Sequence, residues 1–244
     1  MKITKIEDLN NILEGITELD ISSLGLTTLP KLAMGPEGPD AVKKDARVFC
    51  SLPQSLTGLY CWNNKLTSLD NLPSGLTILI CSNNELTILD NLPQSLTRLI
   101  CSDNKLTSLD NLPQGLTRLF CGKNNLKSLN NLPQGLIILL CSHNKLTILN
   151  NLPTSLKHLN CSHNKLTILN NLPQSLTKLK CSNNNLIILD IENCNDLGYF
   201  CCNDNNFPEE MVTILDDEDL TIQEKINKLI EECLIPNDNS FVLK

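Results

Sequence analysis

The chain is poor in aromatic residues and has no strong excess of positive charge. Only 3% of its 244 residues are aromatic and only one is tryptophan, whereas 41% are hydrophobic. Its apolar core must therefore consist mainly of aliphatic side chains. The formal net charge is −7 and the pI is about 5.0. Nucleic-acid-binding domains usually carry clustered Lys and Arg and have a much higher pI, so we expect no nucleic-acid partner.

Signals for targeting, membrane insertion and catalysis are also missing. The N-terminal segment MKITKIEDLNNILEG is charged throughout, and neither a signal peptide nor a membrane span is evident. Gly35 and Gly38 lie in a proline-rich stretch without the strand–helix context of a phosphate loop. No nucleophile, base and orienting acid form a recognisable set. These absences predict an intracellular, cytoplasmic protein with no membrane association, no cofactor and no enzymatic activity.

Cysteine, in contrast, is abundant and periodic. Seven of the 12 cysteines recur every 20 residues, at Cys61, Cys81, Cys101, Cys121, Cys141, Cys161 and Cys181. Around each of them runs a variant of L-x-x-L-x-C-S-x-N-x-L-T-x-L-D-N-L-P-x-S. A fixed period of this length is typical of a solenoid, in which each unit buries its apolar side against its neighbours.

We interpret the periodic cysteines as packing residues. They occupy an inward strand position, like the leucines, and neighbouring strands lie about 4.8 Å apart. That spacing is compatible with a disulfide, but parallel Cβ vectors match its geometry poorly. Metal sites use closely spaced, convergent ligands, so no metal site is predicted. The cysteines are read as small buried hydrophobes in a reducing compartment.

The segment L-x-x-L-x-C-x-x-N-x-L resembles the characteristic segment of leucine-rich repeat proteins, with cysteine where the family often has Leu or Val. The 20-residue period and the closing Leu-Pro are similar to the shortest class of that family. This class occurs in secreted bacterial effectors and in proteins of giant amoeba-infecting viruses, which implies a host-cytoplasmic location if the chain is one of these. The resemblance implies an α/β-type repeat solenoid with a parallel β-sheet on its concave face and extended or polyproline-like segments on its convex face.

The resemblance also implies a structural role for one asparagine per unit. This asparagine should satisfy backbone groups at the turn after each strand, because an unpaired buried amide is costly. The residues concerned are Asn64, Asn84, Asn104, Asn124, Asn144, Asn164 and Asn184. Independently, a 20-residue unit leaves little room for a helix, and the proline in its second half biases the preceding residue away from one.

We expect a helical cap at each end of a solenoid that spans residues 16–207. Residues 1–15 are the N-terminal cap, because Thr4 and Glu7 form a capping box. Residues 208–244 form an acidic C-terminal cap and tail with ten acidic and three basic residues. Within it, residues 221–234 read as an amphipathic helix that lies over the last repeat and closes the open sheet edge.

Residues 32–51 interrupt the repeat. The stretch is one period long, but Pro36 and Pro39 fall where inward strand leucines belong. Proline cannot donate to a central strand, and deletion of these residues restores the repeat. We favour a looped-out irregular insertion over a degenerate repeat, and both alternatives remain open.

The residues that flank the central leucine of each strand should point outward on the concave face. They form an apolar stripe over five repeats and then turn polar and basic. The candidate partner-binding residues are Tyr60, Trp62, Ile78, Ile80, Arg98, Ile100, Arg118, Phe120, Ile138, Leu140, His158 and Lys178. Exposed apolar patches usually mark interaction sites, and aromatic and Arg side chains dominate interface energy. The alternatives are that β-propensity alone selects these residues or that a second copy covers them.

The three histidines, His143, His158 and His163, lie on or beside the same face. No carboxylate or cysteine converges with them there, so we read them as solvated surface residues.

The sequence therefore predicts a non-enzymatic protein–protein interaction scaffold with an unidentified protein partner. One alternative is a substrate-recognition subunit for a separate enzyme assembly, such as a ubiquitin ligase. Another is a self-associating structural protein. Some effectors that resemble this chain carry a catalytic ubiquitin-ligase domain, but the 37 residues after Phe207 are too few for one. Cys233 falls on the apolar helix face and is read as a packing residue.

Overall fold

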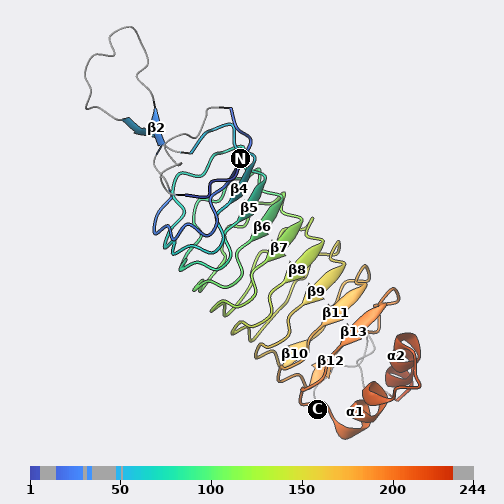
Figure 1. Cartoon of the computed structure of the whole chain (residues 1–244). Helices are drawn as coiled ribbons and strands as arrows, with labels where there is room; N and C mark the ends of the chain where they lie inside the picture. The colour runs from blue at the N-terminus through green and yellow to red at the C-terminus, as the bar shows by residue number, and fades with distance from the viewer. Residues whose placement is uncertain (6–14, 30–31, 35–47, 51, 233–244) are drawn as a thin grey trace, which may run out of the picture.

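The computed structural model describes residues 1–5, 15–29, 32–34, 48–50 and 52–232. The chain forms an elongated solenoid with a main sheet of nine parallel strands that follow one another in chain order (Figure 1). These strands are β1 (Glu18–Asp20), β4 (Gly58–Tyr60), β5 (Ile78–Ile80), β6 (Arg98–Ile100), β7 (Arg118–Phe120), β8 (Ile138–Leu140), β9 (His158–Asn160), β11 (Lys178–Lys180) and β13 (Tyr199–Cys201). Each repeat therefore adds one strand, and the predicted repeat solenoid with a parallel sheet is confirmed.

The core is a single aliphatic cluster that runs along the whole solenoid. In the unit of β4, the central Leu59 and the following Cys61 are fully buried, as are Leu56 and Leu66. The equivalent residues in the following units, as far as Cys181 and Leu186, are buried in the same cluster. A fully buried leucine contributes about 1.5–3 kcal/mol before entropy is subtracted, so the repetition of these positions stabilises the stack.

Two turns in each of the six regular units from Leu56 to Ser175 use left-handed backbone. The first follows the buried cysteine, as at Asn63 with a φ of 55°, and the second precedes the Leu-Pro of the same unit. The second position is always asparagine, at Asn71, Asn91, Asn111, Asn131, Asn151 and Asn171, with φ values from 52° to 59°. Asn adopts this conformation more readily than other residues with a side chain, which explains why the sequence repeats it there.

The side opposite the main sheet is extended, as expected. Among the described residues 52–207 it contains no helix, and its only regular elements are the short paired strands β10 (Ile168–Leu169) and β12 (Ile188–Leu189) (Figure 1). In each unit the backbone turns at the Leu-Pro, where the Leu76 N–H donates to the Pro73 carbonyl at 3.1 Å.

The N-terminal residues cover the edge of the sheet, which the sequence did not indicate. Lys2 forms a parallel bridge to Asp20 of β1, and the Ile3 N–H donates to the Asp20 carbonyl at 2.8 Å. The Ile3 side chain is 2% exposed and belongs to the core. The helix expected over the rest of residues 1–15 falls mainly outside the described residues.

The irregular stretch 32–51 adds no described strand to the main sheet. Strand β1 pairs directly with β4, with Leu19 opposite Leu59. Strands β2 (Leu32–Met34) and β3 (Val48–Cys50) instead pair antiparallel with each other. This register supports the looped-out alternative, which stays a proposal because most of the stretch lies outside the described residues.

Two helices follow the last strand. Helix α2 (Ile222–Glu231) begins with the expected capping box, in which the Glu224 N–H donates to Thr221 Oγ1 and the Glu224 carboxylate accepts from the Thr221 N–H. The end of the predicted segment 221–234, including Cys233, lies outside the described residues. Helix α1 (Glu209–Asp216) was not predicted. No helix among the described residues is long and apolar enough to cross a membrane.

The two helices pack against each other and against the end of the solenoid. Met211 and Ile214 of α1 and Ile226 and Leu229 of α2 are buried in the same cluster as the repeat leucines. The division into an N-terminal cap, a solenoid and an acidic C-terminal cap remains a proposal that this packing supports.

Candidate functional site

The solvent-facing residues of the main-sheet strands β4, β5, β6, β7, β8, β9 and β11, together with Trp62, define a surface that we call the sheet face. In most of these strands the central leucine is buried and the two flanking residues are half-buried or exposed. Because the strands are in register, the flanking residues form two rows across the sheet. The first row is Gly58, Ile78, Arg98, Arg118, Ile138, His158 and Lys178, and the second is Tyr60, Ile80, Ile100, Phe120, Leu140, Asn160 and Lys180.

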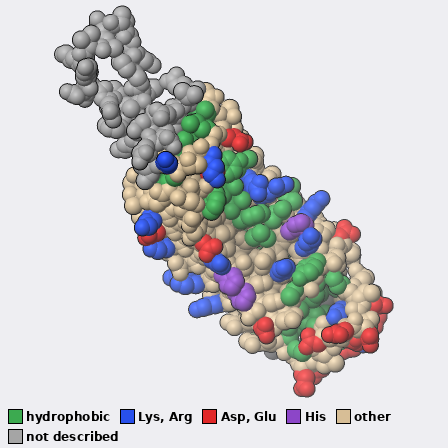
Figure 2. All heavy atoms as spheres, in the orientation of Figure 1, with side chains coloured by type: hydrophobic (Ala, Val, Ile, Leu, Met, Phe, Trp, Pro, Cys, Tyr) green, Lys and Arg blue, Asp and Glu red, His purple; other side chains and the backbone are tan. Residues whose placement is uncertain are grey.

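Most of the apolar side chains of this face come together in one patch. We define the apolar stripe as Tyr60, Ile80, Ile100, Phe120 and Leu140, with Ile78 and Ile138 beside them. All seven are half-buried rather than buried. Figure 2 shows a band of hydrophobic side chains over this part of the sheet, with Lys and Arg side chains alongside. Trp62 lies one residue beyond the buried Cys61 and is 42% exposed.

Two arginines interrupt the first row. Arg98 and Arg118 are direct partners in the register of β6 and β7. Neither forms an ion pair with any described residue. The Arg98 Nε atom is buried and has no hydrogen-bond partner among the described residues. The guanidinium of Arg98 is therefore partly removed from water without a compensating anion.

Beyond Leu140 the face becomes polar and basic. His158, Lys178 and Lys180 continue the two rows, and Lys180 Nζ lies 5.1 Å from the ring centroid of Tyr199 in β13. Burial lowers the pKa of His158, and the charges of Lys178 and Lys157 add to this effect. The candidate residues predicted from the sequence end at Lys178 and omit Tyr199, which is 44% exposed.

The asparagine ladder fixes the turn that follows each strand. Asn124 Oδ1 accepts from the Leu106 N–H of the preceding unit at 3.0 Å. Its Nδ2 donates to the carbonyls of Cys101 at 3.0 Å and of Cys121 at 3.2 Å. The other asparagines repeat this arrangement, so each side chain links two successive turns. At the N-terminal end Asn64 accepts instead from both Leu24 and Leu26.

The periodic cysteines carry free thiols inside the stack. Burial raises the pKa of Cys61, Cys101 and Cys161 to about 12 and moves that of the others in the same direction. A thiol with such a pKa is a poor nucleophile near neutral pH, because the thiolate is the reactive form.

Two histidines stack at the turn beside the sheet face. The rings of His143 and His163 are 4.0 Å apart and nearly parallel. Burial lowers the pKa of His143, and the neighbouring His163 and Lys123 lower it further. No group of three or more His, Cys, Asp or Glu side chains suited to a metal ion is found in the part of the chain that the structure describes.

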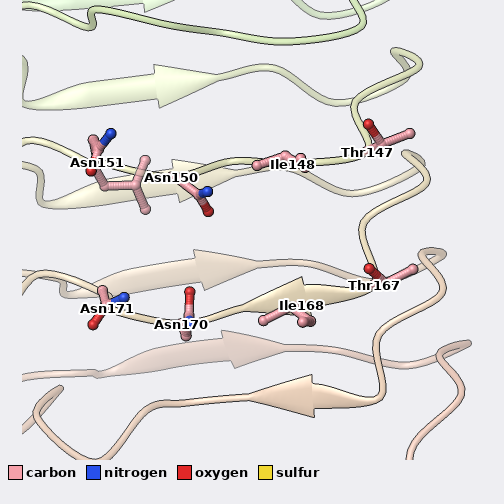
Figure 3. A pocket seen from close by; sticks show the side chains of 9 residues that line it. Thr147, Ile148, Asn150, Asn151, Thr167, Ile168, Asn170 and Asn171 are labelled. Carbon is pink, nitrogen blue, oxygen red and sulfur yellow. The ribbon is translucent and has the colours of Figure 1, made fainter.

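A shallow groove lies on the opposite side of the solenoid. It is formed by the same segment of two successive repeats, and its labelled residues are Thr147, Ile148, Asn150, Asn151, Thr167, Ile168, Asn170 and Asn171 (Figure 3). Ile148 and Ile168 are 57% and 42% exposed. The equivalent position in two preceding repeats is occupied by Ser108 and Ser128, so the exposed isoleucines on this side do not form a continuous row like the apolar stripe.

The stacked strands, the buried cysteines and the asparagine hydrogen bonds define a parallel β-solenoid built from 20-residue units. No protein-family profile matches the chain, and no curated protein matches its sequence. Several solved structures, in contrast, are similar to the chain. The functional domain of InlJ from Listeria monocytogenes, which includes a cysteine ladder, is 38% identical over 62% of this chain and 35% of its own, with a TM-score of 0.59.

Two bacterial effectors show the same architecture. The leucine-rich effector YopM from Yersinia pestis is 30% identical over 78% of this chain and 50% of its own, with a TM-score of 0.64. A Shigella effector LRR domain is 24% identical over 86% of this chain and 77% of its own, with a TM-score of 0.55, and supports the fold alone. The chain thus spans about a third of the InlJ functional domain and half of the YopM chain. The chain is a leucine-rich repeat protein with a 20-residue unit.

Proposed function

We propose that this protein is a non-enzymatic scaffold that binds another protein on its sheet face. The observation that carries the proposal is the apolar stripe, which crosses five neighbouring strands without an interrupting charge in its main row. A large apolar patch on a soluble surface usually marks an interaction site. Phe120 and Tyr60 supply the aromatic anchors that dominate interface energies.

β-Propensity alone explains the stripe less well. Propensity acts on any solvent-facing strand position, yet the same two rows carry His158, Asn160, Lys178 and Lys180 in β9 and β11. The change from apolar to basic residues occurs along one continuous sheet, which supports a difference in what the two parts of the sheet face bind.

The comparison with YopM, which is 30% identical, supports an effector-like role. YopM is described as a leucine-rich effector protein. Free buried thiols suit a reducing compartment, which supports an intracellular location. A substrate-recognition subunit for a separate enzyme assembly, such as a ubiquitin ligase, uses the same sheet face and is a more specific form of this proposal. A self-associating structural protein is the alternative from a different class.

Affinity capture from a cell lysate tests the proposal, with Phe120→Asp as the disrupting variant. Phe120 is half-buried, so we expect this charge to abolish capture with little change in melting temperature. Ile148→Asp is the matched control, because it places the same charge on an exposed isoleucine of the opposite side. If both variants retain the captured protein, the sheet face is not the binding surface. Sedimentation at two protein concentrations separates self-association from binding to another protein.

A further inference from the structure

The charges of the repeats are divided unequally between their surfaces. Residues 56–187 contain eleven basic and five acidic residues. Glu85 and Asp103 form ion pairs with Lys105 and Lys123 at 3.0 and 3.4 Å. The other three acidic residues lie in the turns that precede each Leu-Pro, at Asp70, Asp90 and Asp110. No acidic residue of these repeats belongs to the sheet face, so its positive charges are not neutralised from within.

The arginines are the basic residues closest to the apolar stripe. Arg98 and Arg118 face each other on paired strands about 4.8 Å apart, and like charges placed this way destabilise a sheet. Ile78 and Ile138 flank them in the first row, and Ile100 and Phe120 lie on the same two strands. An unneutralised pair of this kind among apolar side chains has no evident role in the stability of the solenoid.

The same surroundings favour a carboxylate ligand. An arginine guanidinium binds a carboxylate through two parallel hydrogen bonds, and such bonds are stronger where water is excluded. The buried Arg98 Nε shows that part of this guanidinium is already desolvated in the free protein. A partner that covers the apolar stripe would exclude water from the remaining donors and would need to place an anion against them.

We propose that the sheet face selects a protein segment that combines apolar side chains with Asp or Glu, and that carboxylates of this segment bind Arg98 and Arg118. This inference rests on the proposed function and adds the chemistry of the partner. The basic end of the face, at Lys178 and Lys180, extends the preference for acidic residues toward the C-terminal repeats.

Two other occupants fit the surface less well. A nucleic acid requires several adjacent cations along its backbone, whereas Ile78 and Ile138 bound the arginine pair on both sides. A second copy of this chain could supply its acidic C-terminal region. However, Glu224 is engaged in the capping box of α2, and the buried apolar residues of α1 and α2 face their own core.

The test begins with a phage-displayed library of random peptides selected on the full chain. We expect selected peptides to combine aliphatic or aromatic residues with Asp or Glu. The affinity of a selected synthetic peptide is then measured for the wild type and for the double variant Arg98→Gln/Arg118→Gln, which should bind about tenfold more weakly or worse. The control Lys127→Gln/Lys145→Gln changes the net charge equally away from the strands and should bind like the wild type. The same peptide with Gln in place of its acidic residues should bind the wild type as weakly as it binds the double arginine variant.

The outcomes distinguish the two proposals. The inference is wrong if selected peptides lack acidic residues or bind the double arginine variant normally. In that case the proposed function still holds, provided that Phe120→Asp abolishes peptide binding. If Phe120→Asp binds normally as well, the sheet face is not the site and both proposals fail. A single-stranded RNA oligonucleotide that displaces the peptide, or concentration-dependent self-association that the arginine variant loses, would also overturn the inference. Unchanged circular dichroism and melting temperature confirm that each variant is folded.

Discussion

Replacement of one ladder asparagine, Asn124→Ala, tests how the solenoid is held together. The carbonyls that Asn124 contacts keep a second partner in the variant. Cys101 O still accepts from Asn104 at 3.1 Å, and Cys121 O still accepts from Asn144 at 3.0 Å. The buried Leu106 N–H, in contrast, has no other hydrogen-bond partner among the described residues. One orphaned donor costs about 1–3 kcal/mol, and the two Nδ2 hydrogens, which the carbonyls of Cys101, Cys121 and Gly122 share, make bonds worth about 0.5–1.5 kcal/mol each. The expected loss of unfolding free energy is therefore about 2–6 kcal/mol.

Urea unfolding measures this loss, and hydrogen exchange locates it. The Leu106 amide should exchange much faster in the variant, because repeats interact with nearest neighbours and can open locally. Asn125→Ala is the control, since the Asn125 side chain makes no hydrogen bond to the described residues, and it should stay within about 0.5 kcal/mol of the wild type. If Asn124→Ala behaves like this control, the ladder does not stabilise the turns and the reasoning fails.

Two further predictions concern the thiols and the left-handed turns. Because folding raises the pKa of the buried thiols from 9.0 to about 12, as at Cys101, their contribution to stability is complete below about pH 8.5 and falls as the pH rises toward the folded value. Between pH 10 and 11 the unfolding free energy of both proteins should fall as the pH rises, and the slope for Cys101→Ala should be smaller than that of the wild type by about 1.4 kcal/mol per pH unit. Equal slopes for the two proteins would contradict this prediction. Asn131 has a φ of 54°, so Asn131→Val should cost about 1–2 kcal/mol in a denaturant titration and Asn131→Gly clearly less. Equal losses of unfolding free energy in the Val and Gly variants would show that the left-handed backbone does not determine which residue is tolerated at position 131.

The sequence was most informative where the repeat is regular. Counting from each cysteine placed Leu59 inside and Tyr60 outside, because side chains alternate along a strand and every unit repeats the same register. The extended convex side followed from the short unit and its proline. The asparagine role came from the resemblance, and the hydrogen bonds of Asn124 now give it a geometric basis.

The irregular ends could not be predicted in the same way. The pairing of Lys2 with β1 depends on an open sheet edge that no local pattern of residues 1–5 reveals. Helix α1 has only eight residues, and Pro208 at its N-cap provides no side-chain hydrogen bond, so the usual start signal is absent. The partly buried guanidinium of Arg98 depends on contacts across neighbouring strands, which the sequence alone does not supply.

Hydroxyl-radical footprinting shows whether a bound peptide covers the sheet face, because it reports the exposure of individual side chains. The peptide selected from the display library is added to the wild type, and oxidation is compared with that of the free protein. We expect the oxidation of Trp62, Tyr60 and Phe120 to fall on binding, while that of Ile148 and Ile168 in the opposite groove is unchanged. Protection of the two isoleucines with no change at the three aromatic residues would place the partner on the opposite side, and the sheet face would not be the binding surface.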